Sequence, residues 1–127
     1  MTDKEQQRPA ALVTGAANRL GLAFATALAD RGYDIALHYH HSTEQAQHQA
    51  ELIRNRGVRC ETFQFDLSDE DPACLIAQVY HRFPGLQVLI NSASAYHAGT
   101  IANTDRALLQ KQFSVNFFAP YLLSGSF

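Results

Sequence analysis

Residues 10–21 read AALVTGAANRLG, and this stretch decides the fold. Its first part, residues 10–14, is a short and mainly apolar run of the kind that parallel sheets bury on both faces. Gly15 can adopt the positive φ of a tight turn, and Gly21 allows a helix to pack closely on the strand before it. The stretch therefore predicts a buried strand, a tight turn and a helix that begins near Leu20.

The turn between this strand and this helix is suited to an anion. Ala16 and Ala17 are small enough for a ligand to approach the backbone. A helix begins with N–H groups that have no partner within it, which favours a phosphate or pyrophosphate at that end. No Lys-Ser or Lys-Thr pair follows the loop, so a P-loop triphosphatase is disfavoured. On this stretch alone, a plain strand–helix turn with two glycines remains the alternative.

The rest of the chain repeats the alternation of apolar runs and helical periodicity. We expect strands and helices in turn, with strands at 10–14, 34–39, 58–65 and 86–90, and helices from about 20, 42 and 68, then at 105–112 and 113–123. This alternation specifies a parallel sheet with helices on both faces and right-handed crossovers. The expected fold is α/β, a Rossmann-type doubly wound parallel sheet, truncated, with strand order 3-2-1-4. Ligands of such sheets bind at the carboxyl ends of the strands.

Periodicity and capping chemistry predict two local details. The first helix should turn its larger apolar side chains inward, on the face formed by Leu20, Ala23, Phe24, Ala27 and Leu28. Ser68 should cap the third helix, because a serine hydroxyl can accept from a free N–H at a helix start.

The composition is that of one globular domain. The chain has 127 residues, of which 46% are hydrophobic, and a net charge of −2, so no polyanion-binding surface is indicated. No apolar run is long enough for a membrane span, and the polar N-terminus has no signal core. Cys60 and Cys74 are too few for a disulfide scaffold or a zinc site. We expect a cytoplasmic protein with a polar tail at residues 1–9.

The loop TGAANRLG at 14–21 resembles the T-G-x-x-x-G-x-G loop of short-chain dehydrogenases/reductases. Arg19 stands where most members have the middle glycine, and this variant is similar to the pteridine reductase branch, which includes dihydromonapterin reductases. Further segments agree in the same order, namely HYHHS at 38–42, Asp66-Leu67, NSASAY at 91–96, and Asn116 followed by PYLL. The resemblance implies that residues 10–127 are the N-terminal part of a dinucleotide-binding Rossmann domain.

The end of the second expected strand indicates which dinucleotide binds. NAD-binding units usually place Asp or Glu there to hold the ribose 2′-hydroxyl, whereas this chain has His38-Tyr39-His40-His41-Ser42. A 2′-phosphate is therefore not repelled, and Arg19, His41 and Ser42 can donate to it. We expect NADP(H) rather than NAD(H). A metal site at His38 and His40 is the alternative, but no carboxylate or cysteine is near them in sequence, and we expect none.

The resemblance implies a role for each matched residue. Cofactor contacts are expected from Gly15, Asn18, Arg19, Leu20, Gly21, His38, Tyr39, His40, His41, Ser42, Asp66, Leu67, Asn91, Ala93 and Ser94. Among these, the Asp66 carboxylate is expected at the adenine amino group, with Leu67 beside it. Tyr96 is expected to stack on a pterin substrate. The backbone carbonyl of Asn116 is the expected catalytic group, holding a water of the proton relay.

Proline chemistry supports the role of Asn116, because Pro120 has no N–H to donate to the carbonyl four residues earlier. Structural interpretations also exist for three of these residues. Asp66 can bond its own turn, Tyr96 can cover the core as a loop aromatic, and Pro120 can be a packing kink.

The family's proton donor is a tyrosine with a lysine four residues later, and no tyrosine of this sequence has a lysine at that spacing. We therefore expect a fragment, about the first half of the family's domain, that is inactive alone. The apolar run at 86–90 would then be an open sheet edge, which favours association with another chain.

The expected function is the NADP(H)-binding part of an oxidoreductase that transfers hydride to a C=N or C=O substrate. A pterin is the candidate substrate, and a homo-oligomer is the expected assembly, with no nucleic acid or membrane partner. One alternative is a non-catalytic dinucleotide-binding or interaction module with the same half-fold. Another is an unrelated flavodoxin-like α/β domain, against which the arginine-containing loop and the Asn91 segment both argue.

Overall fold

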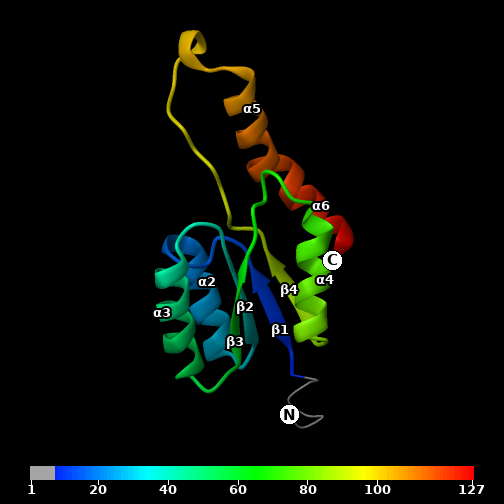
Figure 1. Ribbon diagram of the computed structural model, residues 1–127. Coiled ribbons are helices and arrows are strands. Elements are labelled where there is room, and N and C mark those ends of the chain that lie inside the picture. Colours follow the sequence, from blue (N-terminus) through cyan, green and yellow to red (C-terminus); the bar gives the residue numbers. More distant parts are fainter. Residues whose placement is uncertain (1–7) are drawn as a thin grey trace.

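The computed structural model describes residues 8–127, which form a four-stranded sheet with helices on both faces (Figure 1). The strands are β1 (Ala10–Val13), β2 (Asp34–Tyr39), β3 (Cys60–Gln64) and β4 (Leu86–Ile90). The helices are α2 (Arg19–Asp30), α3 (Thr43–Arg54), α4 (Pro72–Arg82), α5 (Arg106–Phe113) and α6 (Ala119–Ser126), with a 3-10 turn η1 (Ile101–Asn103) and a π-helix η2 (Ser114–Phe118). Residues 1–7 of the predicted polar tail lie outside the described residues.

The strand order β3-β2-β1-β4 confirms the predicted Rossmann-type topology. Every strand pair is parallel, and Ala11 of β1 lies opposite Ile35 of β2 and Val88 of β4. All of β1 is buried, as the central strand of a sheet covered on both faces should be. Because the strands are parallel, their carboxyl ends meet at one edge of the sheet.

The core lies in two layers, one on each face of the sheet (Figure 1). On one face, small residues of α2 and α3 pack against β1 and β2, with Ile53 as a large contributor. On the other face, Leu75 and Val79 of α4, Phe83 just after it and Leu123 of α6 are buried against the same strands. A sheet covered in this way leaves the strand ends and their loops as the natural place for a site.

The face that α2 buries differs from the predicted one. Its buried residues are Gly21, Ala25 and Ala29, whereas Leu20 is 63% exposed and Phe24 39% exposed. Leu28 of the predicted face packs against the core while partly buried, but the prediction was wrong for Leu20 and Phe24. A Cβ on Gly21 would lie only 2.2 Å from the carbonyl oxygen of Gly15, so only small residues fit along this stripe.

The start of α4 also differs from the prediction. The helix begins at Pro72, and the Asp71 side chain caps it by accepting from the N–H of Ala73. The predicted cap, Ser68, lies before the helix, and its hydroxyl donates to the Asp66 carboxylate at 2.6 Å. The proline determines this start, since it is favoured in the first helical turn, where no N–H is required.

Beyond β4 the chain leaves the sheet as an extended loop and returns through α5, so that α6 packs beside α4 (Figure 1). The π-helix η2 joins α5 to α6, and the N–H of Ala119 donates to the carbonyl of Ser114, five residues earlier. This wider turn contains Asn116 and ends two residues before Pro120. Within residues 8–127, no helix is both long enough and apolar enough to cross a membrane.

We expect Gly21→Ala to destabilise the fold, because the added methyl group would overlap the carbonyl of Gly15. Overpacking of this kind costs about 1–3 kcal/mol, which urea unfolding followed by circular dichroism would detect as a lower midpoint. Gly125→Ala is the matched control, since this glycine of α6 has open space around its Cβ position. It should raise stability by up to about 1 kcal/mol. Equal midpoints for Gly21→Ala and the unaltered protein would contradict the close approach of α2.

Candidate functional site

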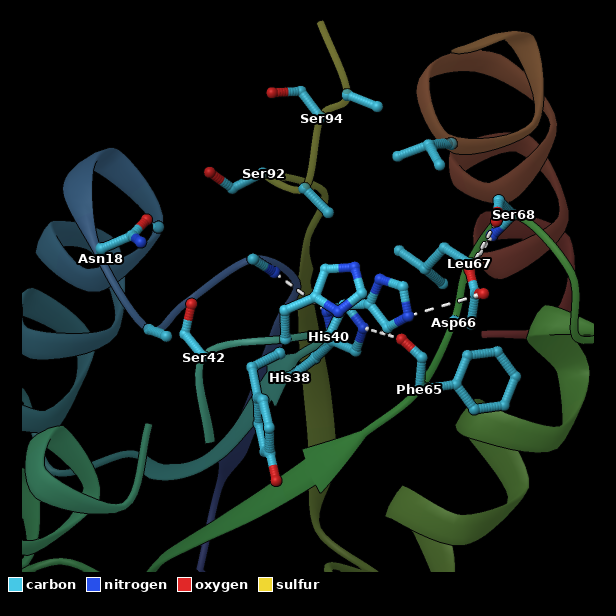
Figure 2. A pocket seen from close by; sticks show the side chains of 18 of the residues that line it. Asn18, His38, His40, Ser42, Phe65, Asp66, Leu67, Ser68, Ser92 and Ser94 are labelled. Carbon is cyan, nitrogen blue, oxygen red and sulfur yellow. Dashed lines mark hydrogen bonds and ion pairs between the residues drawn. The ribbon is translucent and has the colours of Figure 1, made fainter. Parts of the chain in front are cut away.

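A pocket of about 620 Å³ opens at the carboxyl ends of the strands (Figure 2). Its walls come from segments far apart in the sequence, namely the β1–α2 loop, the ends of β2 and β3, the loop after β4, and α5 with η2. The volume lies within the range usual for small-molecule sites. The predicted cofactor residues that line it are Gly15, Asn18, Arg19, Leu20, Gly21, His38, Tyr39, His40, His41, Ser42, Asp66, Leu67, Ala93 and Ser94.

The β1–α2 loop forms the floor of the pocket through close backbone packing. Gly15 has φ +61°, and a Cβ placed there would lie 2.8 Å from the Cα of Ala93 in the loop after β4. At the start of α2, Asn18 makes no side-chain capping bond. The first N–H groups of this helix therefore have no capping side chain and are available to an anionic ligand.

Thr14 holds the β1–α2 loop and the loop after β4 together, a role that the sequence analysis missed. Its buried hydroxyl accepts from the N–H groups of Ser92 and Ala93, each at 3.0 Å, and lies 3.4 Å from the carbonyl oxygen of Ile90. Its partners are nearly eighty residues away along the chain. No local pattern could therefore have indicated them.

Arg19 adopts a backbone conformation that side chains rarely take. Its φ is +52°, and within residues 8–127 no other residue except glycine has a positive φ. The left-handed region costs an ordinary residue roughly 1–2 kcal/mol. Arg19 is exposed at the rim of the pocket and opens α2. Strain of this kind at a pocket is compatible with a functional need for the side chain.

His38 lies beneath the pocket with both ring nitrogens occupied (Figure 2). Its Nδ1 accepts from the N–H of Gly15 at 3.0 Å, and its Nε2 lies 2.9 Å from the carbonyl oxygen of Phe65. Burial lowers the pKa of His38, and the neighbouring His40 adds to this effect, while the bond to Phe65 opposes it. The neutral ring is therefore favoured in the fold, and its contribution to stability diminishes as the pH falls below the ordinary histidine range.

The end of β3 contributes a carboxylate to the wall opposite α2. Asp66 Oδ1 accepts from the hydroxyl of Ser68 and from its N–H at 2.9 Å, while Oδ2 lies 3.5 Å from Nε2 of His40 (Figure 2). The Ser68 hydroxyl bond, more than the nearby charges of His40 and Lys111, holds the pKa of Asp66 below its ordinary value. Lys111 of α5 also lines the pocket, a residue that the sequence analysis did not select.

The remaining predicted residues lie outside the pocket wall. The Asn91 amide donates to the hydroxyl of Ser124 at 3.3 Å. Tyr96 is 87% exposed on the loop after β4. The Asn116 side chain makes two 2.7 Å bonds to the backbone of Ala95, donating to its carbonyl and accepting from its N–H. Asn116 thus fixes the loop that carries Tyr96, while its backbone carbonyl belongs to η2.

The sheet topology and the pocket define an α/β domain with a pocket at the switch point between parallel strands, where ligands of such sheets bind. The family model described as short chain dehydrogenase matches residues 9–127. The chain belongs to this family. Its relatives include an uncharacterized oxidoreductase, YmfI of Bacillus subtilis, which is 33% identical over 115 residues, or 90% of this chain and 47% of YmfI.

Two solved structures are similar to this chain over most of its length. A short chain dehydrogenase from Burkholderia cenocepacia in complex with NADP has a TM-score of 0.88 and 31% identity, covering 96% of this chain and 50% of that one. FolM alternative dihydrofolate reductase 1 from Brucella suis, also in complex with NADP, has a TM-score of 0.85 and 30% identity, covering 93% of this chain and 48% of that one. The chain spans between about a third and a half of the length of the curated relatives it matches.

We expect Arg19→Gly to stabilise the protein, because glycine adopts φ +52° without the steric cost that arginine pays. The free energy of unfolding in urea should rise by about 1 kcal/mol. Arg106→Gly, at the ordinary start of α5, is the control and should lower it by a few tenths to about 1 kcal/mol. A loss of stability in Arg19→Gly equal to that of the control would show that residue 19 is not strained.

Proposed function

We propose that this chain is the NADP(H)-binding part of a short-chain reductase. One observation carries the proposal, namely that the segment at the end of β2 supplies His40, His41 and Ser42, and no carboxylate of its own, to the pocket that Arg19 also lines. This set can donate several hydrogen bonds to a 2′-phosphate, and none of its four side chains carries a negative charge. The NADP complexes of the Burkholderia and Brucella proteins support the same choice of cofactor.

The residues present fit a dinucleotide in two independent respects. The start of α2 has no side-chain cap, so its N–H groups can donate to the pyrophosphate. The two glycines of the loop stand where a Cβ would collide with backbone, at 2.2 Å for Gly21 and 2.8 Å for Gly15. The loop is therefore as thin as a backbone allows, which brings the ligand close to the N–H groups of Ala17 and Asn18.

Asp66 and Leu67 complete the proposed cofactor site at its adenine end. Because Ser68 bonds one carboxylate oxygen of Asp66, the side chain is held in one orientation and its pKa is lowered. It is therefore ionised at neutral pH and can accept from the adenine amino group. His40 lies 3.5 Å from the other carboxylate oxygen.

When bound, the cofactor supplies a hydride for a C=N or C=O bond. In our proposal the chain binds and orients it through the start of α2, the ends of β2 and β3, and Ala93 and Ser94 after β4. Asn91, outside the pocket wall, supports this segment from below through its bond to Ser124. We assign the backbone carbonyl of Asn116 to the proton relay, supported by its place in η2, four residues before Pro120, which has no N–H to donate to it. The Asn116 side chain holds the loop after β4 against η2 through its paired bonds to Ala95.

We further propose a pterin as the substrate. The loop after β4 carries Ser94 at the pocket and the exposed ring of Tyr96 two residues later. A flat heterocycle can stack on such a ring. The likeness to the Brucella FolM alternative dihydrofolate reductase supports this class, because dihydrofolate contains a pterin ring.

Arg19→Ala should weaken NADPH binding by about 1.5–3 kcal/mol, the size of a charged hydrogen bond, and should leave NADH binding almost unchanged. Titration of each dinucleotide by fluorescence or calorimetry checks this. Arg106→Ala, which changes an arginine of α5 outside the pocket, should alter neither affinity. Equal losses for both dinucleotides in Arg19→Ala would refute the assignment of the 2′-phosphate to this guanidinium.

The protein that carries this chain should consume NADPH faster with a dihydropterin than with a 3-oxoacyl thioester, as followed by the absorbance of NADPH. Tyr96→Ala should raise KM for the pterin roughly twofold to tenfold, the worth of an aromatic stacking contact, at unchanged NADPH affinity. Tyr121→Ala is the control, since this tyrosine is 72% exposed and lies away from the pocket. NADPH binding without turnover of any carbonyl or imine substrate would favour a non-catalytic dinucleotide-binding module instead.

A further inference from the structure

His38 connects three strand ends beneath the pocket. It lies in β2, its ring accepts from Gly15 after β1, and its ring also meets the carbonyl of Phe65 after β3 (Figure 2). Its own carbonyl accepts from the N–H of Ala16 at 2.9 Å. Two consecutive N–H groups of the β1–α2 loop, those of Gly15 and Ala16, are therefore bonded to this one residue.

The geometry permits one protonation state of the ring. A carbonyl oxygen only accepts, so Nε2, at 2.9 Å from Phe65, must carry a hydrogen. The N–H of Gly15 only donates, so Nδ1 must present its lone pair. The ring is the neutral Nε2–H tautomer, and a second proton would point at the N–H of Gly15. Neither nitrogen remains free for a ligand in the pocket.

We propose that His38 is a positioning residue, which through Nδ1 holds Gly15, and with it the β1–α2 loop, in the ligand-binding conformation. The proposal rests on the proposed function of the pocket, and it replaces the direct cofactor contact that the sequence analysis expected of this ring. Gly15 needs this support because it has φ +61° and can also adopt many other conformations. Its packing against Ala93 restrains it from the opposite side.

The charged groups around His38 do not take over this role. His40 lies just after β2 and is close to the carboxylate of Asp66, which follows β3, and Lys111 of α5 is close to the same carboxylate. These groups surround the open side of the pocket, while His38 is only 2% exposed beneath it. The Gly15 N–H therefore depends on the His38 ring for its hydrogen bond.

Two substitutions separate the functions of the two ring nitrogens. In His38→Asn the amide oxygen can take the place of Nδ1, and in His38→Gln the amide nitrogen can take the place of Nε2. We expect His38→Asn to keep the affinity for NADPH and NADH within about twofold. We expect His38→Gln to weaken both dinucleotides alike, by roughly fivefold to tenfold, the worth of a neutral hydrogen bond. Calorimetric titration of the folded variants measures both affinities.

Unaltered affinities in folded His38→Gln would overturn the proposal, and so would a loss confined to NADPH, which would indicate direct contact with the 2′-phosphate. A measurement on the unaltered protein covers the case in which a variant does not fold. Nitrogen-15 NMR of the histidine rings should show the Nε2–H tautomer for His38, with slow hydrogen exchange at the Gly15 amide. An Nδ1–H tautomer or a rapidly exchanging Gly15 amide refutes the inference. If the unaltered protein binds no dinucleotide, the proposed function fails, and the tautomer and exchange still decide the role of His38.

Discussion

The contact between the start of α2 and the turn after β1 is the constraint on which the site depends. Gly21 has no side chain, so the helix can rest on the carbonyl of Gly15, and no other residue would fit there. This contact directs the uncapped end of α2 into the pocket. It also explains why the buried stripe of α2 consists of glycine and alanine, since larger side chains would lift the helix away from the sheet.

Around that contact, the strand ends are joined by side chains rather than by the sheet ladder alone. Thr14 ties the end of β1 to the loop after β4, and His38 ties the ends of β1, β2 and β3 to one another. Both side chains are buried and fully bonded, which rigidifies a polar network in a region of low dielectric constant. The loops at the site are therefore held by the same core that stabilises the fold.

Sequence reasoning predicted the alternation of strands and helices, the strand order and most of the residues that line the pocket, because these follow from hydrophobic periodicity and from glycines at a strand–helix turn. Sequence reasoning was wrong where the tertiary packing determines which way a side chain faces or which group it bonds. The large side chains of Leu20 and Phe24 face outward because of the close approach of α2. Ser68 bonds Asp66 instead of capping a helix. Thr14 and Lys111 were missed, since their significance lies in neighbours brought together only by the fold.

The hydroxyl of Thr14 also has a mechanical consequence. It binds the N–H groups of Ser92 and Ala93 at one point, and the paired bonds of Asn116 to Ala95 fix the chain a short distance further on. The segment between these two anchors cannot slide along the sheet edge. The exposed stretch that follows therefore starts from a fixed point at Ala95, beside the floor of the pocket.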